Sequence, residues 1–145
     1  MTMRRQPLVL YWDASAILSV LVQDTHSRVA ARWSVRDGLH LVSTLGWAET
    51  TAVLHRLAGE GHITKVLLDS ALESLATGPW RLVQRGPDQD AIDSLAARHV
   101  LRGADLWHLA QAQTLLGELP GLKMLTFDRR LRTAAESEGL SPGEG

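Results

Sequence analysis

The segment LVLYWDAS, residues 8–15, is the stretch from which the fold is best predicted. The five apolar residues Leu8–Trp12 are typical of a buried strand, and Asp13 follows them without a break. Ser15 then begins a helical pattern that runs to about Leu21. A buried strand that leads directly into a helix indicates an α/β protein, in which parallel neighbouring strands are joined by crossover connections.

The same alternation of short apolar runs and longer helical stretches continues along the chain. The further expected strands are 39–43, 80–84 and 123–127, and the expected helices are 15–21, 27–36, 45–58, 63–76, 88–98, 103–116 and 129–138. We therefore expect one domain over residues 1–145, with a mostly parallel, four- to five-stranded sheet between two layers of helices. We expect the tail from Leu140 on, and 141–145 in particular, to be frayed.

The composition fits one globular domain in the cytoplasm. The 145 residues are 45% hydrophobic and 21% charged, which suffices for a real core. We expect no membrane span and no signal peptide, because the longest uncharged apolar runs are too short. The absence of Cys excludes disulfides, thiolate zinc sites and thiol catalysis. With a net charge of -1, any nucleic-acid contact must come from a local basic patch.

Four acidic residues occupy positions where we expect burial, which is unfavourable for an unpaired carboxylate. Asp13 and Asp128 each follow an apolar strand-like run, and the carboxyl ends of parallel strands meet at the sheet edge where ligands bind. Glu49 and Asp105 lie among apolar residues at helical spacing, so we expect both to face inward. Converging carboxylates repel one another unless a cation or proton compensates. The set therefore predicts a site for Mg²⁺ or Mn²⁺, which prefer oxygen ligands.

Each acid also has a purely structural interpretation. Asp13 and Asp128 suit the N-caps of the helices that follow them, and Asp105 can likewise cap its own helix. Glu49 can pair with Arg56 or His55, although a buried ion pair often fails to offset its desolvation. These alternatives stay open for each residue singly, but one shared site explains all four together.

Four segments carry a resemblance to a known family: YWDASAIL around Asp13, WAETTAVLHRL around Glu49, LRGADLWHLAQA around Asp105 and LTFDRRLRTAA around Asp128. In this order they resemble the four acidic motifs of PIN-domain nucleases, and more narrowly those of the VapC-type toxins of bacterial VapBC toxin–antitoxin pairs. The resemblance spans residues 8 to about 140. The ordered set is far more specific than any single motif.

The resemblance implies a PIN-like fold and a Mg²⁺-dependent endoribonuclease, with Mn²⁺ as a substitute, whose four acids hold the metal while activated water cleaves RNA. It also implies a homodimer and a cognate antitoxin. Ser15 and Thr126 match the small hydroxyl positions of the family. Arg129, Arg130 and Arg132 open the last expected helix, where they either position RNA phosphates or form a solvated helix face.

Other residues near the acids are assigned to packing. His108 follows the third acid by three positions, and we place it in the core or at its rim rather than in the site. Trp12, Trp47 and Trp107 are neighbours of the acids, and core packing is favoured over base stacking for all three.

Three other functions are compatible with parts of this pattern. A housekeeping PIN nuclease in RNA processing would share the chemistry, whereas a non-catalytic module that binds RNA or protein would tolerate the loss of an acid. A phosphoacceptor receiver domain needs an Asp at the end of a central strand, but the expected strand 80–84 is followed by Arg85 and Gly86. The intact set of four acids favours a nuclease.

Overall fold

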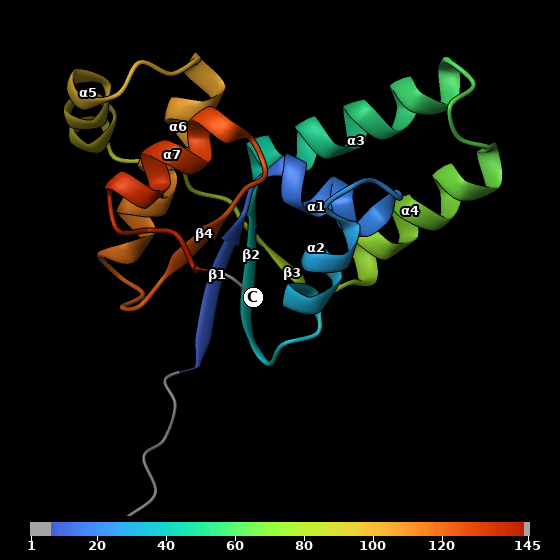
Figure 1. Cartoon of the computed structure of the whole chain (residues 1–145), viewed down its shortest axis with the longest axis horizontal. Helices are drawn as coiled ribbons and strands as arrows, with labels where there is room; N and C mark the ends of the chain where they lie inside the picture. Colours follow the sequence, from blue (N-terminus) through green and yellow to red (C-terminus); the bar gives the residue numbers. More distant parts are fainter. Residues whose placement is uncertain (1–6, 144–145) are drawn as a thin grey trace, which may run out of the picture.

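Four parallel strands form the centre of the structure, a computed structural model that describes residues 7–143. The two central strands are β1 (Leu8–Trp12) and β2 (Gly38–Ser43), and the edge strands are β3 (Trp80–Val83) and β4 (Lys123–Leu125). The strand order is β3-β2-β1-β4, and every pairing is parallel. All four carboxyl ends therefore lie at the same edge of the sheet (Figure 1).

Helices cover the sheet from two sides. One side carries α1 (Ala14–Leu21), α2 (Ser27–Ser34), α3 (Thr44–Gly59) and α4 (Lys65–Thr77), and the other carries α5 (Gln89–Arg98), α6 (Gly103–Leu116) and α7 (Arg129–Ser137), as Figure 1 shows. The predicted α/β fold with a parallel sheet between helices is confirmed. In the part of the chain that the structure describes, no helix has the length and apolarity needed to cross a bilayer.

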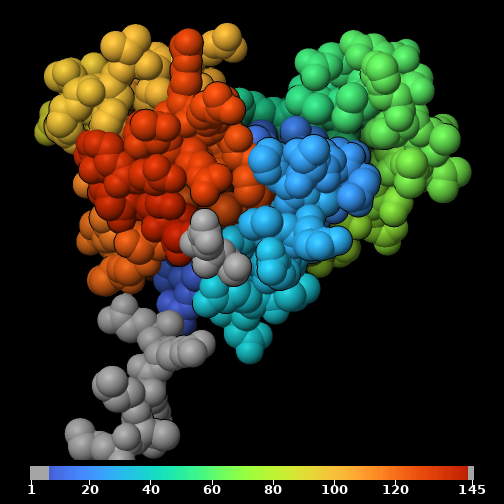
Figure 2. Space-filling model, in the orientation of Figure 1, coloured from blue at the N-terminus to red at the C-terminus, as the bar shows by residue number. Residues whose placement is uncertain are grey.

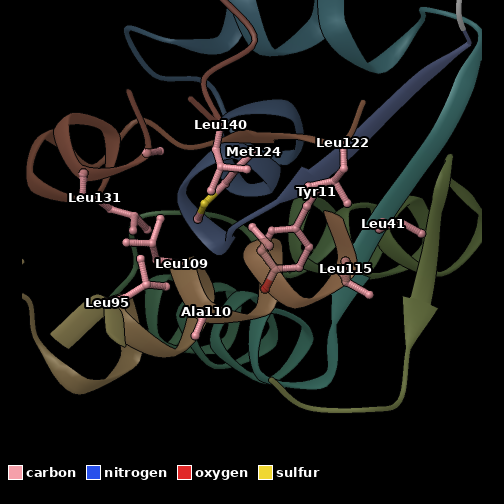
Figure 3. Packing of buried hydrophobic residues seen from close by; sticks show 13 residues of the cluster. Tyr11, Leu41, Leu95, Leu109, Ala110, Leu115, Leu122, Met124, Leu131 and Leu140 are labelled. Carbon is pink, nitrogen blue, oxygen red and sulfur yellow. The ribbon is translucent and has the colours of Figure 1, made fainter. Parts of the chain in front are cut away.

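Alternate residues of the strands pack into two hydrophobic cores, one on each face of the sheet. Tyr11, Leu41 and Met124 belong to the core under α5, α6 and α7, whose packing Figure 3 shows. Leu10 and Trp12 belong to the core under α1 and α2. Because β1 is buried on both faces, its sequence is apolar throughout instead of alternating between apolar and polar. The assignment of Trp12 to the core is confirmed, since its side chain is fully buried.

Strand β4 is shorter than predicted. It ends at Leu125, whose carbonyl accepts a hydrogen bond from the Asp13 N–H at 3.2 Å, and the next two residues leave the sheet. The expectation that Asp128 directly follows the strand is therefore wrong. Two residues, Thr126 and Phe127, separate them, because Thr126 turns its hydroxyl toward the end of β1 instead of continuing the ladder.

The chain after α7 returns to the sheet. Leu140 is fully buried, and its carbonyl accepts a hydrogen bond from the Met124 N–H at 2.7 Å. The expectation that fraying begins at Leu140 is wrong, because this residue completes the core beside β4. Residues 141–143 form neither helix nor strand, and residues 144–145 of the predicted frayed tail lie outside the described residues.

Candidate active site

The carboxyl edge of the sheet opens between two lobes. Helices α1, α3, α6 and α7 all begin near this edge, as Figure 1 shows. Figure 2 shows a notch at the top of the molecule, between the lobe that contains α5, α6 and α7 and the lobe that contains α3 and α4. Asp13 and Asp128 are the N-caps of α1 and α7, Asp105 lies in the first turn of α6, and Glu49 lies in the second turn of α3.

Asp13 is buried and is held by three donors. Its Oδ1 accepts from the Ser15 hydroxyl at 2.7 Å and from the Ala16 N–H at 3.0 Å, and its Oδ2 accepts from the Thr126 hydroxyl at 2.6 Å. Burial raises the pKa of Asp13 above its usual range, although these three bonds and the charge of His108 oppose the rise. Asp13 is therefore the N-cap of α1, as its structural interpretation predicted, and its carboxylate is also buried.

The two predicted hydroxyl residues connect distant parts of the chain. Ser15 Oγ accepts from the Phe127 N–H at 3.0 Å, and Thr126 Oγ1 accepts from the Asp128 N–H at 3.1 Å. The two hydroxyl oxygens lie 3.3 Å apart. They thus join the turn after β1 to the turn after β4 and hold Asp13 between the two turns.

Asp128 caps α7 and lies near a group of arginines. Its Oδ1 accepts from a main-chain N–H in the first turn of the helix at 2.9 Å, so the capping interpretation is correct for this residue. Arg129 and Arg130 are exposed and line an open cleft beside the loop between α5 and α6. Arg132 Nε instead lies 3.3 Å from Glu136 Oε1. The structure therefore separates the three predicted RNA-binding arginines into two environments.

Asp105 lies in the first turn of α6 and is half-buried. The N-cap of this helix is Arg102, so the interpretation of Asp105 as a cap is wrong. Burial raises the pKa of Asp105 above its usual range, the negative charges of Asp128 and Glu49 raise it further, and the charges of His108 and Arg102 oppose the rise. Asp105 therefore experiences the charges of two of the other acids.

Glu49 is held by a histidine from another helix. Its Oε1 lies 2.5 Å from His108 Nε2, and its side chain is 33% exposed. The predicted buried stripe through Glu49 is wrong, because the buried positions of α3 are Gly46, Thr50 and Leu54. Glu49 lies at the border of that stripe, which leaves its carboxylate free to reach the sheet edge.

The sequence prediction did not include His108 among the site residues. This side chain is almost completely buried, as predicted for a core histidine, and it also contacts one of the four acids. The alternative pairing of Glu49 with Arg56 is wrong, because Arg56 lies 3.9 Å from Glu60. The sequence does contain one relevant signal: positions three apart share a face of a helix, so His108 lies on the same face of α6 as Asp105.

The four acids lie toward the carboxyl edge of the sheet, but they do not form a complete metal-binding site. Within residues 7–143, no three His, Asp or Glu side chains are placed to hold one metal ion together. Three of the four are turned toward protein donors, Asp13 to two hydroxyls, Asp128 to its helix and Glu49 to His108. Burial raises the pKa of Asp13 and of Asp105, and the negative charges of Asp128 and Glu49 add to the rise at Asp105. A set of hard oxygen donors with excess negative charge fits a divalent cation of the Mg²⁺ type.

Comparisons with known proteins agree with this architecture. The family model of the PIN domain matches residues 10–137. Ribonuclease VapC45 of Mycobacterium tuberculosis (strain CDC 1551 / Oshkosh) and Ribonuclease VapC49 of Mycobacterium tuberculosis (strain H37Rv) are each 39% identical to the chain over 139 residues, which cover 92% of the chain and 92% of each relative. The chain belongs to the PIN domain family. The predicted resemblance to its VapC-type members is confirmed.

Solved structures give the same fold. The crystal structure of Mycobacterium tuberculosis VapC20, described as a sarcin–ricin loop cleaving toxin, superposes with a TM-score of 0.63 at 15% identity and covers 94% of this chain and 99% of that one. PAE2754 from Pyrobaculum aerophilum gives a TM-score of 0.55 at 20% identity, with 88% and 79% covered. At these identities the superpositions support the fold alone.

Proposed function

We propose that this chain is a Mg²⁺-dependent endoribonuclease, the toxin of a toxin–antitoxin pair. Membership in the PIN domain family and the names of the two ribonuclease relatives support the activity. The observation that carries the metal requirement is the Asp13 carboxylate, which is buried at the sheet edge and bonded to neutral donors. Asp105 in addition experiences the negative charges of Asp128 and Glu49. The surplus negative charge of these groups calls for a cation.

Asp13 and Asp105 are the proposed principal metal ligands, with Glu49 and Asp128 as further ligands, either directly or through water. Mg²⁺, or Mn²⁺ in its place, would neutralise charge on the scissile phosphate and activate a water molecule for attack on it. The residues of the chain have a separate task, which is to hold carboxylates together that would otherwise repel one another. Two unit charges about 4 Å apart cost on the order of 4 kcal/mol at an effective dielectric of about 20.

Ser15 and Thr126 perform this task for Asp13. Each hydroxyl donates to a different oxygen of the carboxylate, at 2.7 and 2.6 Å, and the two donors belong to different turns. A carboxylate oxygen has two lone pairs. Oδ1 already accepts two bonds, from Ser15 and Ala16, whereas Oδ2 accepts only the bond from Thr126 and keeps the capacity to accept a further ligand. The carboxylate is thereby oriented before any metal binds.

Arg129 and Arg130 are the proposed contacts to RNA phosphates. They follow Asp128 directly and line the open cleft beside the loop between α5 and α6, which also contains Arg98 and the exposed Val100. This local basic patch would attract a polyanion to the acidic notch despite the net charge of -1. Arg132 is a weaker candidate, because Glu136 already neutralises it.

A homodimer and a cognate antitoxin are proposed from the resemblance to VapC-type proteins. The cytoplasmic location stays a prediction. The two other functions predicted from the sequence, an RNA-processing nuclease and a non-catalytic binding module, have no observation of their own in their favour. Growth arrest on expression, relieved by Asp13→Asn, would support a toxin over a processing enzyme.

The direct test is RNA cleavage by Asp13→Asn and Asp105→Asn, with Asp69→Asn as the matched control on the exposed face of α4. We expect both site variants to lose Mg²⁺-dependent cleavage and the control to keep it, because only the first two carboxylates lie at the sheet edge. Full activity in either site variant would refute the site assignment. Cleavage by the wild type in excess chelator would refute the metal requirement, and RNA binding without cleavage would favour a binding module.

A further inference from the structure

The imidazole of His108 is bonded at both of its nitrogens inside the protein. Nε2 lies 2.5 Å from Glu49 Oε1, and Nδ1 lies 2.5 Å from the Tyr11 hydroxyl oxygen. The Tyr11 hydroxyl is in turn 3.1 Å from Ser43 Oγ, which also accepts from the Gly46 N–H at 2.9 Å. This buried chain of bonds runs from the end of β2 through β1 and α6 to Glu49 on α3.

The direction of the bond to Glu49 follows from chemistry. An ionised carboxylate has only lone pairs, so the proton between the two groups belongs to His108 Nε2. The Tyr11 hydroxyl has one proton and two lone pairs, and it can therefore bond both Ser43 and His108 whichever way that proton points. In each arrangement the Nε2 proton stays on the bond to Glu49.

Tyr11 is suited to hold the ring in this orientation. Its side chain is fully buried, and burial raises the pKa of the phenol far above its ordinary value, while the bond to Ser43 opposes the rise and the charges of Asp13 and Glu49 add to it. The phenol is therefore neutral at any physiological pH.

Glu49 depends on this bond more than the other acids depend on any one partner. Asp13 has three donors and Asp128 is fixed as the cap of α7. Glu49 has a longer side chain, and among the described residues the His108 imidazole is the only group hydrogen-bonded to its carboxylate. Without that bond, the carboxylate would rotate more freely.

We propose that His108 is a positioning residue: it donates from Nε2 to Glu49 Oε1, is locked at Nδ1 by Tyr11, and leaves Oε2 of Glu49 available to the metal and its water. This role adds a fifth residue to the four acids. The expected effect of His108 on metal binding rests on the proposed function. Outer partners that orient a metal-binding carboxylate in this way are worth about 10- to 100-fold in metal affinity or activity.

Three substitutions separate the bond from the packing. In His108→Gln the amide nitrogen can take the place of Nε2 and donate to Glu49. In His108→Asn the shorter amide reaches only the place of Nδ1. His108→Phe keeps a ring but has no donor. We expect His108→Gln to bind Mn²⁺ within about threefold of the wild type, and His108→Asn and His108→Phe to bind it about 10- to 100-fold more weakly. The Mg²⁺ concentration for half-maximal cleavage should shift in parallel, with KM for RNA unchanged.

His40 provides the matched control. It is also a buried histidine bonded at both nitrogens, to Trp12 Nε1 at 3.0 Å and to the Arg36 carbonyl at 2.8 Å, but it contacts none of the acids. His40→Phe should lower the melting temperature without moving the Mn²⁺ affinity. A His108→Phe variant with the affinity of the wild type would overturn the proposal. A His108→Gln variant as weak as His108→Phe would also overturn it, because packing rather than the bond would then be responsible.

A second measurement needs no folded His108 variant and no metal. In the ¹⁵N spectrum of the metal-free wild type, the His108 ring should show a protonated Nε2, and Glu49→Ala should shift that signal. A ring with a bare Nε2 would overturn the proposal. If the wild type binds no Mn²⁺ or Mg²⁺ but shows the protonated Nε2, the proposed function fails while the hydrogen bond stands, so the two failures are distinguishable.

Discussion

Asp13→Asn should stabilise the metal-free protein while it removes the metal response. An Asn Oδ1 can keep both bonds of Asp13 Oδ1, from the Ser15 hydroxyl and the Ala16 N–H. Its Nδ2 would then face Thr126 Oγ1, which can accept a bond as readily as donate one. Asn is also as good an N-cap as Asp. The substitution therefore removes the buried charge, at the cost of the acceptor that Asp13 Oδ2 offers to the Thr126 hydroxyl.

The size of the effect follows from the raised pKa of Asp13, which burial causes. When the folded pKa of an acid exceeds its unfolded value, the folded state binds the proton more tightly, so stability is present below the unfolded pKa and is lost as pH rises through the folded pKa. The free energy of unfolding falls by about 1.4 kcal/mol for each unit by which the folded pKa exceeds the unfolded pKa. For a chain of this length, 1 kcal/mol corresponds to roughly 4 °C in melting temperature.

Thermal unfolding of both proteins in chelator, from pH 8 downward, measures this effect. At pH 7 Asp13→Asn should melt several degrees above the wild type, and the difference should shrink as pH falls toward the ordinary Asp value of 3.8. Mg²⁺ at about 100 times its Kd should then stabilise the wild type by about 2.7 kcal/mol, or roughly 10 °C, and the variant hardly at all. A metal-free variant that melts below the wild type at pH 7 would show that the charge is already compensated and would refute this reasoning.

Other residues give further predictions. Thr126→Val removes a donor from the buried Asp13, so it should cost about 1–3 kcal/mol in the free energy of unfolding and weaken Mg²⁺ binding; unchanged values in denaturant melts and metal titration would contradict this. The pKa of Glu138 is lowered to about 2, chiefly by Arg98 and then by a histidine. Glu138→Gln should therefore lower the melting temperature above pH 4.5, and the difference from the wild type should disappear as pH falls toward 2. Charge reversal of Arg129 and Arg130 should weaken RNA binding. The slope of log K against log salt concentration should become shallower by about 0.7 for each RNA phosphate that is no longer neutralised. An unchanged slope would exclude these two arginines as phosphate ligands.

The secondary-structure elements and the approximate place of the acids could be predicted from the sequence alone. Strand-length apolar runs and helical spacing are local properties, so the positions of β1, β2 and α6 followed from them with few errors at the ends. Residues that follow parallel strands must meet at one edge of the sheet, which placed Asp13 correctly and Asp128 three positions beyond the end of a strand. The sequence also contained His108 at three residues from Asp105, but nothing local indicated its partners.

The side chains that hold the acids became known only from the three-dimensional fold. Thr126 bonds Asp13 across 113 positions of sequence, and His108 bonds Tyr11 and Glu49 across 97 and 59. Periodicity tells which face of a helix or strand a residue occupies, but the residue that it meets there depends on the register of the strands and on how the helices pack against the sheet. For the same reason, only the fold reveals that the Asp that caps α1 is also buried and bonded to a threonine from near the other end of the chain.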